Sequence, residues 1–215
     1  MDDPAVDAGE LADNFDDIEI ANRYFGGVAP VATAVFSHGV RSLLDVGCGS
    51  GDIARALLRE GRRHSRPLEV VALDRSEKVL AIARARTPGE LQLRFMRGDA
   101  TALPFLDRSF DIATCNLTLH HFDPDRVPLV LRELRRVSRI TPLVCDLERS
   151  RLGYVAAVLF ARLIAKNRLT KHDGPLSVKR AYTKGELLAF AAAAGWRAPY
   201  VRRSAFFRVV LGDRD

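Results

Sequence analysis

The chain has 215 residues and a formal net charge of +6, with 47% hydrophobic and 28% charged residues. This composition is typical of a folded globular protein and excludes a wholly disordered one, and the length suits one domain. The three cysteines, Cys48, Cys115 and Cys145, are too few and scattered for a disulfide framework or a spaced zinc site, so we expect a reducing compartment and no metal. The acidic N-terminus differs from a signal peptide, and no apolar run reaches the roughly 18 residues of a membrane span. These features together predict a cytoplasmic protein.

Basic residues outnumber acidic residues, but they occur in several short groups beside amphipathic segments rather than in one block. Charges arranged in this way are typical of solvated helix faces. The sequence also has no nucleic-acid motif in which basic residues alternate with stacking aromatic residues. Nucleic acid is therefore not an expected partner.

After residue 40, short runs of Val, Leu and Ile bounded by turn residues alternate with segments of helical spacing. The apolar runs predict buried strands. Their alternation with helices predicts βαβ units with right-handed crossovers, and therefore an α/β fold with a doubly wound, mostly parallel sheet. The expected strands are Ser42–Val46, Glu69–Leu73, Leu91–Met96, Asp111–Cys115 and Pro142–Leu147, and the expected helices are Asp52–Arg62, Ser76–Arg86 and Asp125–Arg139.

The pattern changes after residue 150. Leu152–Ala165 is a 14-residue apolar stretch interrupted only by Arg162, and a basic, turn-rich loop is expected to follow at Lys166–Arg180. A helix is then expected at Thr183–Ala194, where Gly195 ends it. Two apolar runs near the C-terminus predict a closing hairpin-like pair of strands, Trp196–Val201 and Phe206–Leu211.

The segment Leu43–Gly51 predicts a strand that runs into a glycine-rich turn before a helix. Glycines allow positive φ angles and the close approach of a ligand. The spacing is G-x-G-x-G, and Asp52 stands where a dinucleotide fingerprint places its third glycine. Because a carboxylate at a helix N-terminus opposes phosphate binding, the turn favours a ligand without phosphate and argues against an NAD-dependent oxidoreductase.

Two further acids follow the next two strands. Asp74 lies 23 residues after Gly51, and an acid at this strand end can accept hydrogen bonds from both hydroxyls of a ribose. Its alternative role is to cap the helix that begins near Ser76. Asp99 is placed to accept a hydrogen bond from an exocyclic amine such as that of adenine, and its alternative role is that of a turn aspartate.

These features together resemble the class I S-adenosylmethionine (SAM)-dependent methyltransferase family. The similarity is close over roughly residues 40–150 and loose after them. Within the family, it is nearest to small-molecule methyltransferases of the ubiquinone and menaquinone biosynthesis type. The motifs that carry the resemblance are LLDVGCGSGDIA (43–54), VVALDRSEKVLAIAR (70–84), GDATALPFLDRSFDIATCNLTLHHF (98–122) and LRELRRV (131–137).

The resemblance implies a Rossmann-like sheet of seven strands with an antiparallel last strand, and SAM as the cofactor. It implies that the glycines of the turn approach the methionine part of SAM, Asp74 the ribose, and Asp99 with Ala100 the adenine. It places Asp45 near the ammonium group and Asn116 on the pocket wall. The expected cofactor-binding residues are Asp45, Gly47, Cys48, Gly49, Gly51, Asp74, Arg75, Asp99, Ala100 and Asn116.

We expect four parts along the chain. Residues 1–40 form an N-terminal helical lid, and residues 41–150 form the SAM-binding core. Residues 151–182 form a helical insertion that borders the acceptor site, and residues 183–215 add the C-terminal helix and closing strands to the same domain. Within the first part, Ile20–Val28 is expected to fold over the cofactor, with a simple packing helix as the alternative.

The methyl acceptor is harder to predict. The family's nucleobase and glutamine N-methyltransferases typically carry N/D-P-P-Y/F after the fourth strand, where this chain has Asn-Leu-Thr-Leu at 116–119. His120 and His121 are candidate general bases for a phenolic or enolic oxygen, although the resemblance implies that histidines here often have no catalytic part. His172, which Asp173 could orient, is a third candidate in the region expected to border the acceptor.

Leu152–Ala165 is either a core-packing helix or an apolar lid over a hydrophobic acceptor, such as a quinone or a polyketide-like phenol. Basic residues within 149–171 would let the same segment contact an anionic membrane. We therefore predict a SAM-dependent methyltransferase that acts on a small, hydrophobic acceptor, on oxygen. The alternatives are an RNA- or protein-directed methyltransferase and a SAM-binding module that regulates a partner without turnover. The sequence leaves the oligomeric state open.

Overall fold

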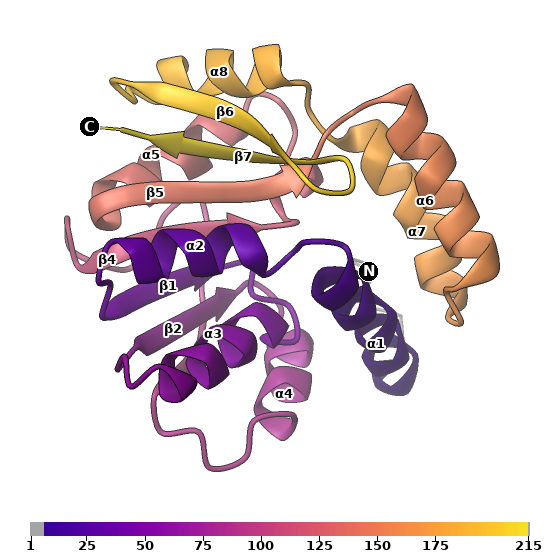
Figure 1. The fold of residues 1–215 in the computed structure, drawn as a ribbon, viewed down its shortest axis with the longest axis horizontal. Coiled ribbons are helices and arrows are strands. Elements are labelled where there is room, and N and C mark those ends of the chain that lie inside the picture. Colours follow the sequence, from indigo (N-terminus) through magenta and orange to yellow (C-terminus); the bar gives the residue numbers. More distant parts are fainter. Residues whose placement is uncertain (1–6, 215) are drawn as a thin grey trace.

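A seven-stranded sheet runs through residues 7–214, the part of the chain that the computed structural model describes (Figure 1). The strand order is β3-β2-β1-β4-β5-β7-β6, and β7 is antiparallel to both of its neighbours while the other pairs are parallel. This confirms the doubly wound sheet with an antiparallel last strand. The strands are β1 (Ser42–Val46), β2 (Glu69–Asp74), β3 (Leu93–Arg97), β4 (Phe110–Asn116), β5 (Ser138–Leu147), β6 (Pro199–Ser204) and β7 (Arg208–Asp213).

Helices cover both faces of the sheet, and a third group lies beyond one end of it. The apolar side chains of α5 and α8 pack on one face, and those of α2, α3 and α4 pack on the other. α1, α6 and α7 lie together past the carboxyl ends of the parallel strands (Figure 1). The helices are α1 (Ala8–Tyr24), α2 (Ala29–Ser37), α3 (Asp52–Arg63), α4 (Glu77–Ala85), the 3-10 helix η1 (Leu119–His121), α5 (Val127–Val137), α6 (Arg151–Leu163), α7 (Arg168–Arg180) and α8 (Lys184–Ala193).

Burial on both faces explains why the strands are unbroken apolar runs rather than alternating ones. In β1, Leu43 belongs to the core beneath α2 and α3, while Leu44 and Val46 belong to the core beneath α5 and α8. Local signals also agree with the helix boundaries. The Ser76 hydroxyl caps α4 by accepting from the Val79 N–H.

The expected loop at Lys166–Arg180 is wrong, because most of it is the helix α7. The Gly-Pro pair at 174–175 favours a turn, yet the helix continues through Pro175. Contacts with α1 compensate for the helix stability that Gly174 and Pro175 remove. The Asp17 carboxylate accepts from the backbone N–H groups of Lys166 and Asn167, and the Asn14 amide donates to the Thr170 hydroxyl at 2.8 Å.

The last two strands begin later than the sequence predicts. Trp196 lies before β6, because its indole N–H donates to the Leu131 carbonyl of α5 and the ring is buried there. Phe206 and Phe207, expected in the last strand, form the turn between β6 and β7 with φ angles of 56° and 58°. Both differences arise from packing that a strand pattern does not encode.

The buried Ser138 hydroxyl joins α5 to the sheet. It donates to the Leu134 carbonyl at 2.7 Å and accepts from the Ala113 N–H at 3.0 Å. Ser138→Ala leaves that buried N–H unsatisfied, so we expect the free energy of unfolding to fall by about 1–3 kcal/mol. Urea unfolding followed by the fluorescence of Trp196 measures this change. Thr33→Ala removes an exposed hydroxyl and is the matched control, with an expected change within about 0.5 kcal/mol; equal effects of the two substitutions contradict the account.

Candidate active site

A cavity of about 750 Å³ opens at the carboxyl ends of β1, β2 and β4. Its floor is formed by the turns that follow these strands, and its walls come from α1, α6, α7 and the turn between β6 and β7. In doubly wound sheets, ligands bind at this edge, where the strand order reverses. The volume lies within the range of pockets that hold a small-molecule ligand.

The glycine turn between β1 and α3 forms one side of the cavity. Gly47, Gly49 and Gly51 have φ angles of 72°, 53° and 74°, which other residues rarely adopt. A Cβ on Gly47 would lie 2.3 Å from the Thr118 side chain. Gly47 and Gly49 line the cavity together with Cys48, whereas Gly51 shapes the turn as the N-cap of α3 and is not among the lining residues.

Asp74, at the end of β2, ties the turn to the next helix. Its Oδ2 accepts from the Gly49 N–H at 3.1 Å and its Oδ1 accepts from the Ser76 N–H at 3.0 Å. A carboxylate offers about four acceptor positions and can accept from several donors at once. Asp74 and Arg75 both line the cavity.

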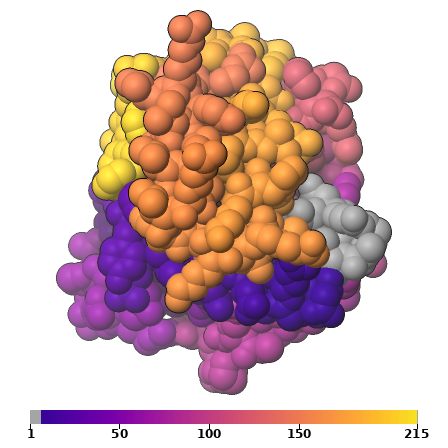
Figure 2. All heavy atoms as spheres, turned by 90° about the vertical axis from the view of Figure 1, so that its right-hand side faces the viewer, coloured from indigo at the N-terminus to yellow at the C-terminus, as the bar shows by residue number. Residues whose placement is uncertain are grey.

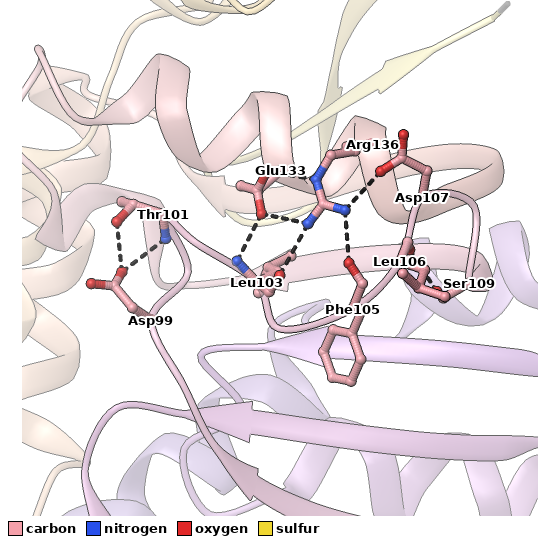
Figure 3. Close-up of polar contacts among 9 residues, drawn as sticks. All are labelled: Asp99, Thr101, Leu103, Phe105, Leu106, Asp107, Ser109, Glu133 and Arg136. Carbon is pink, nitrogen blue, oxygen red and sulfur yellow. Dashed lines mark hydrogen bonds and ion pairs between the residues drawn. The ribbon is translucent and has the colours of Figure 1, made fainter.

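Asp99 and Ala100 line the cavity after β3. The Asp99 Oδ1 accepts from both the backbone N–H and the hydroxyl of Thr101 at 2.8 Å, and these bonds lower the pKa of Asp99. Arg136 of α5 holds the following loop, because it donates to the Leu103 and Phe105 carbonyls and pairs with Glu133 and Asp107 (Figure 3). The loop that carries Asp99 is therefore fixed to α5.

Asp45 and Asn116 form a buried polar pair at the ends of β1 and β4. The Asn116 amide donates to Asp45 Oδ1 at 3.2 Å, while Asp45 Oδ2 and Asn116 Oδ1 have no hydrogen-bond partner among residues 7–214. Burial raises the pKa of Asp45 to about 7, although the bond from Asn116 acts in the opposite direction. Two unpartnered acceptors beside the glycine turn suit a ligand with N–H donors and positive charge.

Asp52, at the first position of α3, adds a third carboxyl group to this side of the cavity. The Asn22 amide of α1 donates to its Oδ2 at 2.9 Å. Burial raises the pKa of Asp52. Together with Asp45 and Asp74, it makes this half of the cavity acidic, which fits a cationic ligand and not a pyrophosphate.

The two adjacent histidines follow β4 on η1 and line the cavity. The buried His120 ring contacts Asp146 of β5, with Nδ1 2.7 Å from Oδ1, and its backbone N–H donates to Oδ2. Burial acts to raise the pKa of Asp146, but the charge and hydrogen bonds of His120 outweigh it and the pKa is lowered. An ionised carboxylate only accepts, so Nδ1 is the donor in this contact and Nε2 is the ring nitrogen that does not face Asp146. The His121 ring lies 4.4 Å from the His120 ring.

His172 does not lie among the residues that line the cavity. Its ring is largely exposed on α7, where Nδ1 contacts the neighbouring Asp173 at 3.0 Å. The structure thus brings together two of the three predicted histidines with nine of the ten predicted cofactor residues.

The polar residues of the site that sequence analysis missed include Asn22 and Arg208, which line the cavity, and Asp146, which contacts His120. Asp146 is an acid near the end of an otherwise apolar strand, and Arg208 is a cation at the start of another such strand. A charged residue at these strand ends is a signal that could have been used. Nothing in the sequence around Asn22 indicates its contact with Asp52.

Comparison with known proteins agrees with this geometry. Residues 43–140 match a family model described as a methyltransferase domain. A demethylmenaquinone methyltransferase of Thermotoga maritima is 45% identical over 96 residues, which are 44% of this chain and 38% of the relative. A ubiquinone/menaquinone biosynthesis C-methyltransferase of Dinoroseobacter shibae is 38% identical over 113 residues, 51% of this chain and 43% of the relative.

These alignments span about two fifths of the length of those relatives. A solved SAM-dependent methyltransferase of Aquifex aeolicus matches the whole fold, with a TM-score of 0.67, 17% identity and coverage of 97% of this chain and 98% of that chain. The fold is that of the class I SAM-dependent methyltransferases. Residues 43–140 form a methyltransferase domain related to those of the quinone methyltransferases, as the sequence motifs indicate.

The protonation of Asp45 makes a testable difference to SAM binding. The carboxyl group must be ionised to attract an ammonium group, so with a pKa of about 7 it is mostly neutral at pH 5.5. We expect the affinity for SAM, measured by calorimetry, to rise roughly tenfold from pH 5.5 to pH 7. Asp45→Asn should abolish this rise, whereas Asp125→Asn, at an exposed position, should keep it. If Asp45→Asn keeps the pH dependence of the wild type, Asp45 does not bind the ammonium group of SAM.

Proposed function

We propose that this protein transfers a methyl group from SAM to a hydroxylated, quinone-like aromatic ring. The observation that carries the proposal is the joining of two chemically different halves in one cavity. One half is the glycine turn with its carboxyl groups, and the other is an apolar chamber whose wall holds the His120–Asp146 pair. Two curated relatives are named for methylation in quinone biosynthesis, which supports this class of acceptor.

The residues on the acidic side fit SAM. When bound, SAM supplies an electrophilic methyl group on a positively charged sulfur. Asp45 and Asn116 would receive the ammonium group with their unpartnered oxygens, and Asp74 would receive the ribose hydroxyls. Asp99 would lie toward the adenine. The carboxyl groups around the turn also favour the sulfonium charge electrostatically.

The acceptor chamber is formed by small and aromatic side chains. Gly153, Ala156, Ala157 and Phe160 of α6 line it, and the Phe25 ring packs edge-on against Phe160. Three of these four α6 side chains are no larger than a methyl group, which favours space for a flat ring beside the helix. Methyl transfer is an in-line displacement, so holding the ring in place is the main contribution of these walls.

His120 would act as the general base. Its Nε2 is available because Nδ1 faces Asp146, and removal of a proton from a ring hydroxyl gives a phenolate. The negative charge of a phenolate is shared by the oxygen and the ring carbons ortho and para to it. The same base therefore serves O-methylation, which the sequence interpretation favours, and C-methylation, which the name of one relative specifies.

Transfer of a labelled methyl group tests this function. We expect label from SAM in the organic-soluble fraction of a reduced lipid extract, and a fall of about 100-fold in rate for His120→Gln. His172→Ala, outside the cavity, should stay within about twofold of the wild type. NMR of the labelled product identifies the methylated atom. Label in RNA or protein, or an unchanged rate in His120→Gln with normal SAM binding, would contradict the proposal.

We further propose that the acceptor reaches the cavity from an anionic membrane surface through α6. Next to the cavity-lining face of this helix lies an exposed apolar row of Leu152, Val155, Leu159 and Leu163, each between 53% and 78% exposed. α6 lies on the outer surface of the molecule beside the β6–β7 turn (Figure 2). Residues 149–171 contain six basic residues and no acidic residue. Among residues 7–214, no helix combines the length and apolarity needed to cross a bilayer.

An apolar row with basic flanks is the pattern of a helix that lies in a membrane interface. We expect the protein to sediment with phosphatidylglycerol vesicles at low salt and far less with neutral vesicles. Leu152→Ser with Leu159→Ser should reduce the bound fraction at least about fivefold. Leu106→Ser, at an 83% exposed position in the loop before β4, is the matched control. Equal binding by both variants, or a dimer that Leu159→Ser dissociates, would contradict membrane docking.

A further inference from the structure

One buried cation of the cavity has no part in the function proposed above. Arg208 begins β7, is 4% exposed and lines the cavity. Its side chain donates one hydrogen bond, from Nη2 to Asn22 Oδ1 at 3.1 Å, and has no other hydrogen-bond partner among residues 7–214. A guanidinium group carries five N–H donors and keeps its charge in proteins. No Arg208 nitrogen is among the buried side-chain atoms of residues 7–214 that lack a partner, so the donors that Asn22 does not use have accessible surface where the residue lines the cavity.

The nearest carboxyl groups do not fill this role. Burial lowers the pKa of Arg208, while the charges of Asp146 and Asp52 oppose that effect. Neither acid forms a hydrogen bond or a close ion pair with it, because Asp146 faces His120 and Asp52 accepts from Asn22. The acids balance part of the charge and leave donors of the guanidinium group without a partner.

The register of the sheet places this cation at the same end of the sheet as the proposed base. Arg208 of β7 is paired with Leu147 of β5, the residue directly after Asp146, so the Arg208 and Asp146 side chains leave the sheet on opposite faces. Leu147 and Phe207 line the cavity on one side of Arg208, and Asn22 on the other side links it to Asp52. In an apolar site, a charged donor interacts strongly with an anionic oxygen.

We propose that Arg208 forms an oxyanion subsite of the acceptor chamber. It would bind the ionised oxygen of an aromatic enolate or phenolate, so the acceptor class is an acidic hydroxylated ring rather than a neutral hydrocarbon. This inference rests on the proposed function, since it assigns the acceptor half of the same cavity. His120 removes the hydroxyl proton, and Arg208 stabilises the negative charge that remains on the oxygen.

Two ring compounds of similar size provide the test. 2-Hydroxy-1,4-naphthoquinone is an anion at neutral pH, and 2-methyl-1,4-naphthoquinone is neutral. With the protein saturated with S-adenosylhomocysteine, calorimetry should show that the wild type binds the anion at least about tenfold more tightly. Arg208→Gln should bind both compounds equally, and Arg208→Lys should keep part of the preference because it keeps the charge.

Arg202→Gln, at an exposed position of β6, is the matched control and should retain the full preference. The affinity for S-adenosylhomocysteine should be the same in Arg208→Gln as in the wild type, which separates this subsite from the cofactor site. Equal affinities of the wild type for the two compounds, or a full preference in Arg208→Gln, would overturn the proposal. If Arg208→Gln does not fold, the wild type and Arg208→Lys still decide the question. Failure to bind S-adenosylhomocysteine would instead count against the proposed function.

Discussion

The turn between β1 and α3 is the constraint on which the rest of the site depends. The Leu73 carbonyl accepts from the N–H groups of Gly47 and Cys48, and the Asp74 carboxylate accepts from that of Gly49. These bonds join the ends of two neighbouring strands at a place where the backbone has positive φ angles. The turn therefore holds Asp74 against the cavity, and the absence of a Cβ on Gly47 leaves room for Thr118.

Charge divides the cavity into two halves. Carboxyl groups at Asp45, Asp52 and Asp74 surround the glycine turn, where a cationic methyl donor fits. His120 and Arg208 also line the cavity, and we propose that they remove the proton of an acceptor hydroxyl and bind the anionic oxygen that results. Each half favours the charge that the other would repel. Under this proposal, the charges of the two halves would hold the methyl donor and the acceptor on different sides of the cavity.

The sequence predicts the sheet, the glycine turn and the acids at or near the ends of β1, β2 and β3. These features are predictable because apolar runs and strand-end positions are local signals. It does not predict α7, since Gly174 and Pro175 indicate a loop and the compensating contacts come from α1, about 150 residues away. The pair His120–Asp146 depends on the pairing of β4 with β5. Arg208 and Asn22 are 186 residues apart in the sequence, so no local pattern predicts their contact.

The central claim is that the turn and its acids bind SAM. Calorimetric titration of S-adenosylhomocysteine into the wild type and into Asp74→Ala tests it most directly, with circular dichroism to show that both are folded. The account predicts binding by the wild type at one site and a loss of at least about tenfold in affinity for Asp74→Ala, since a buried ribose would lose a charged acceptor. Equal affinity of the two folded proteins, or no binding by the wild type, would contradict it.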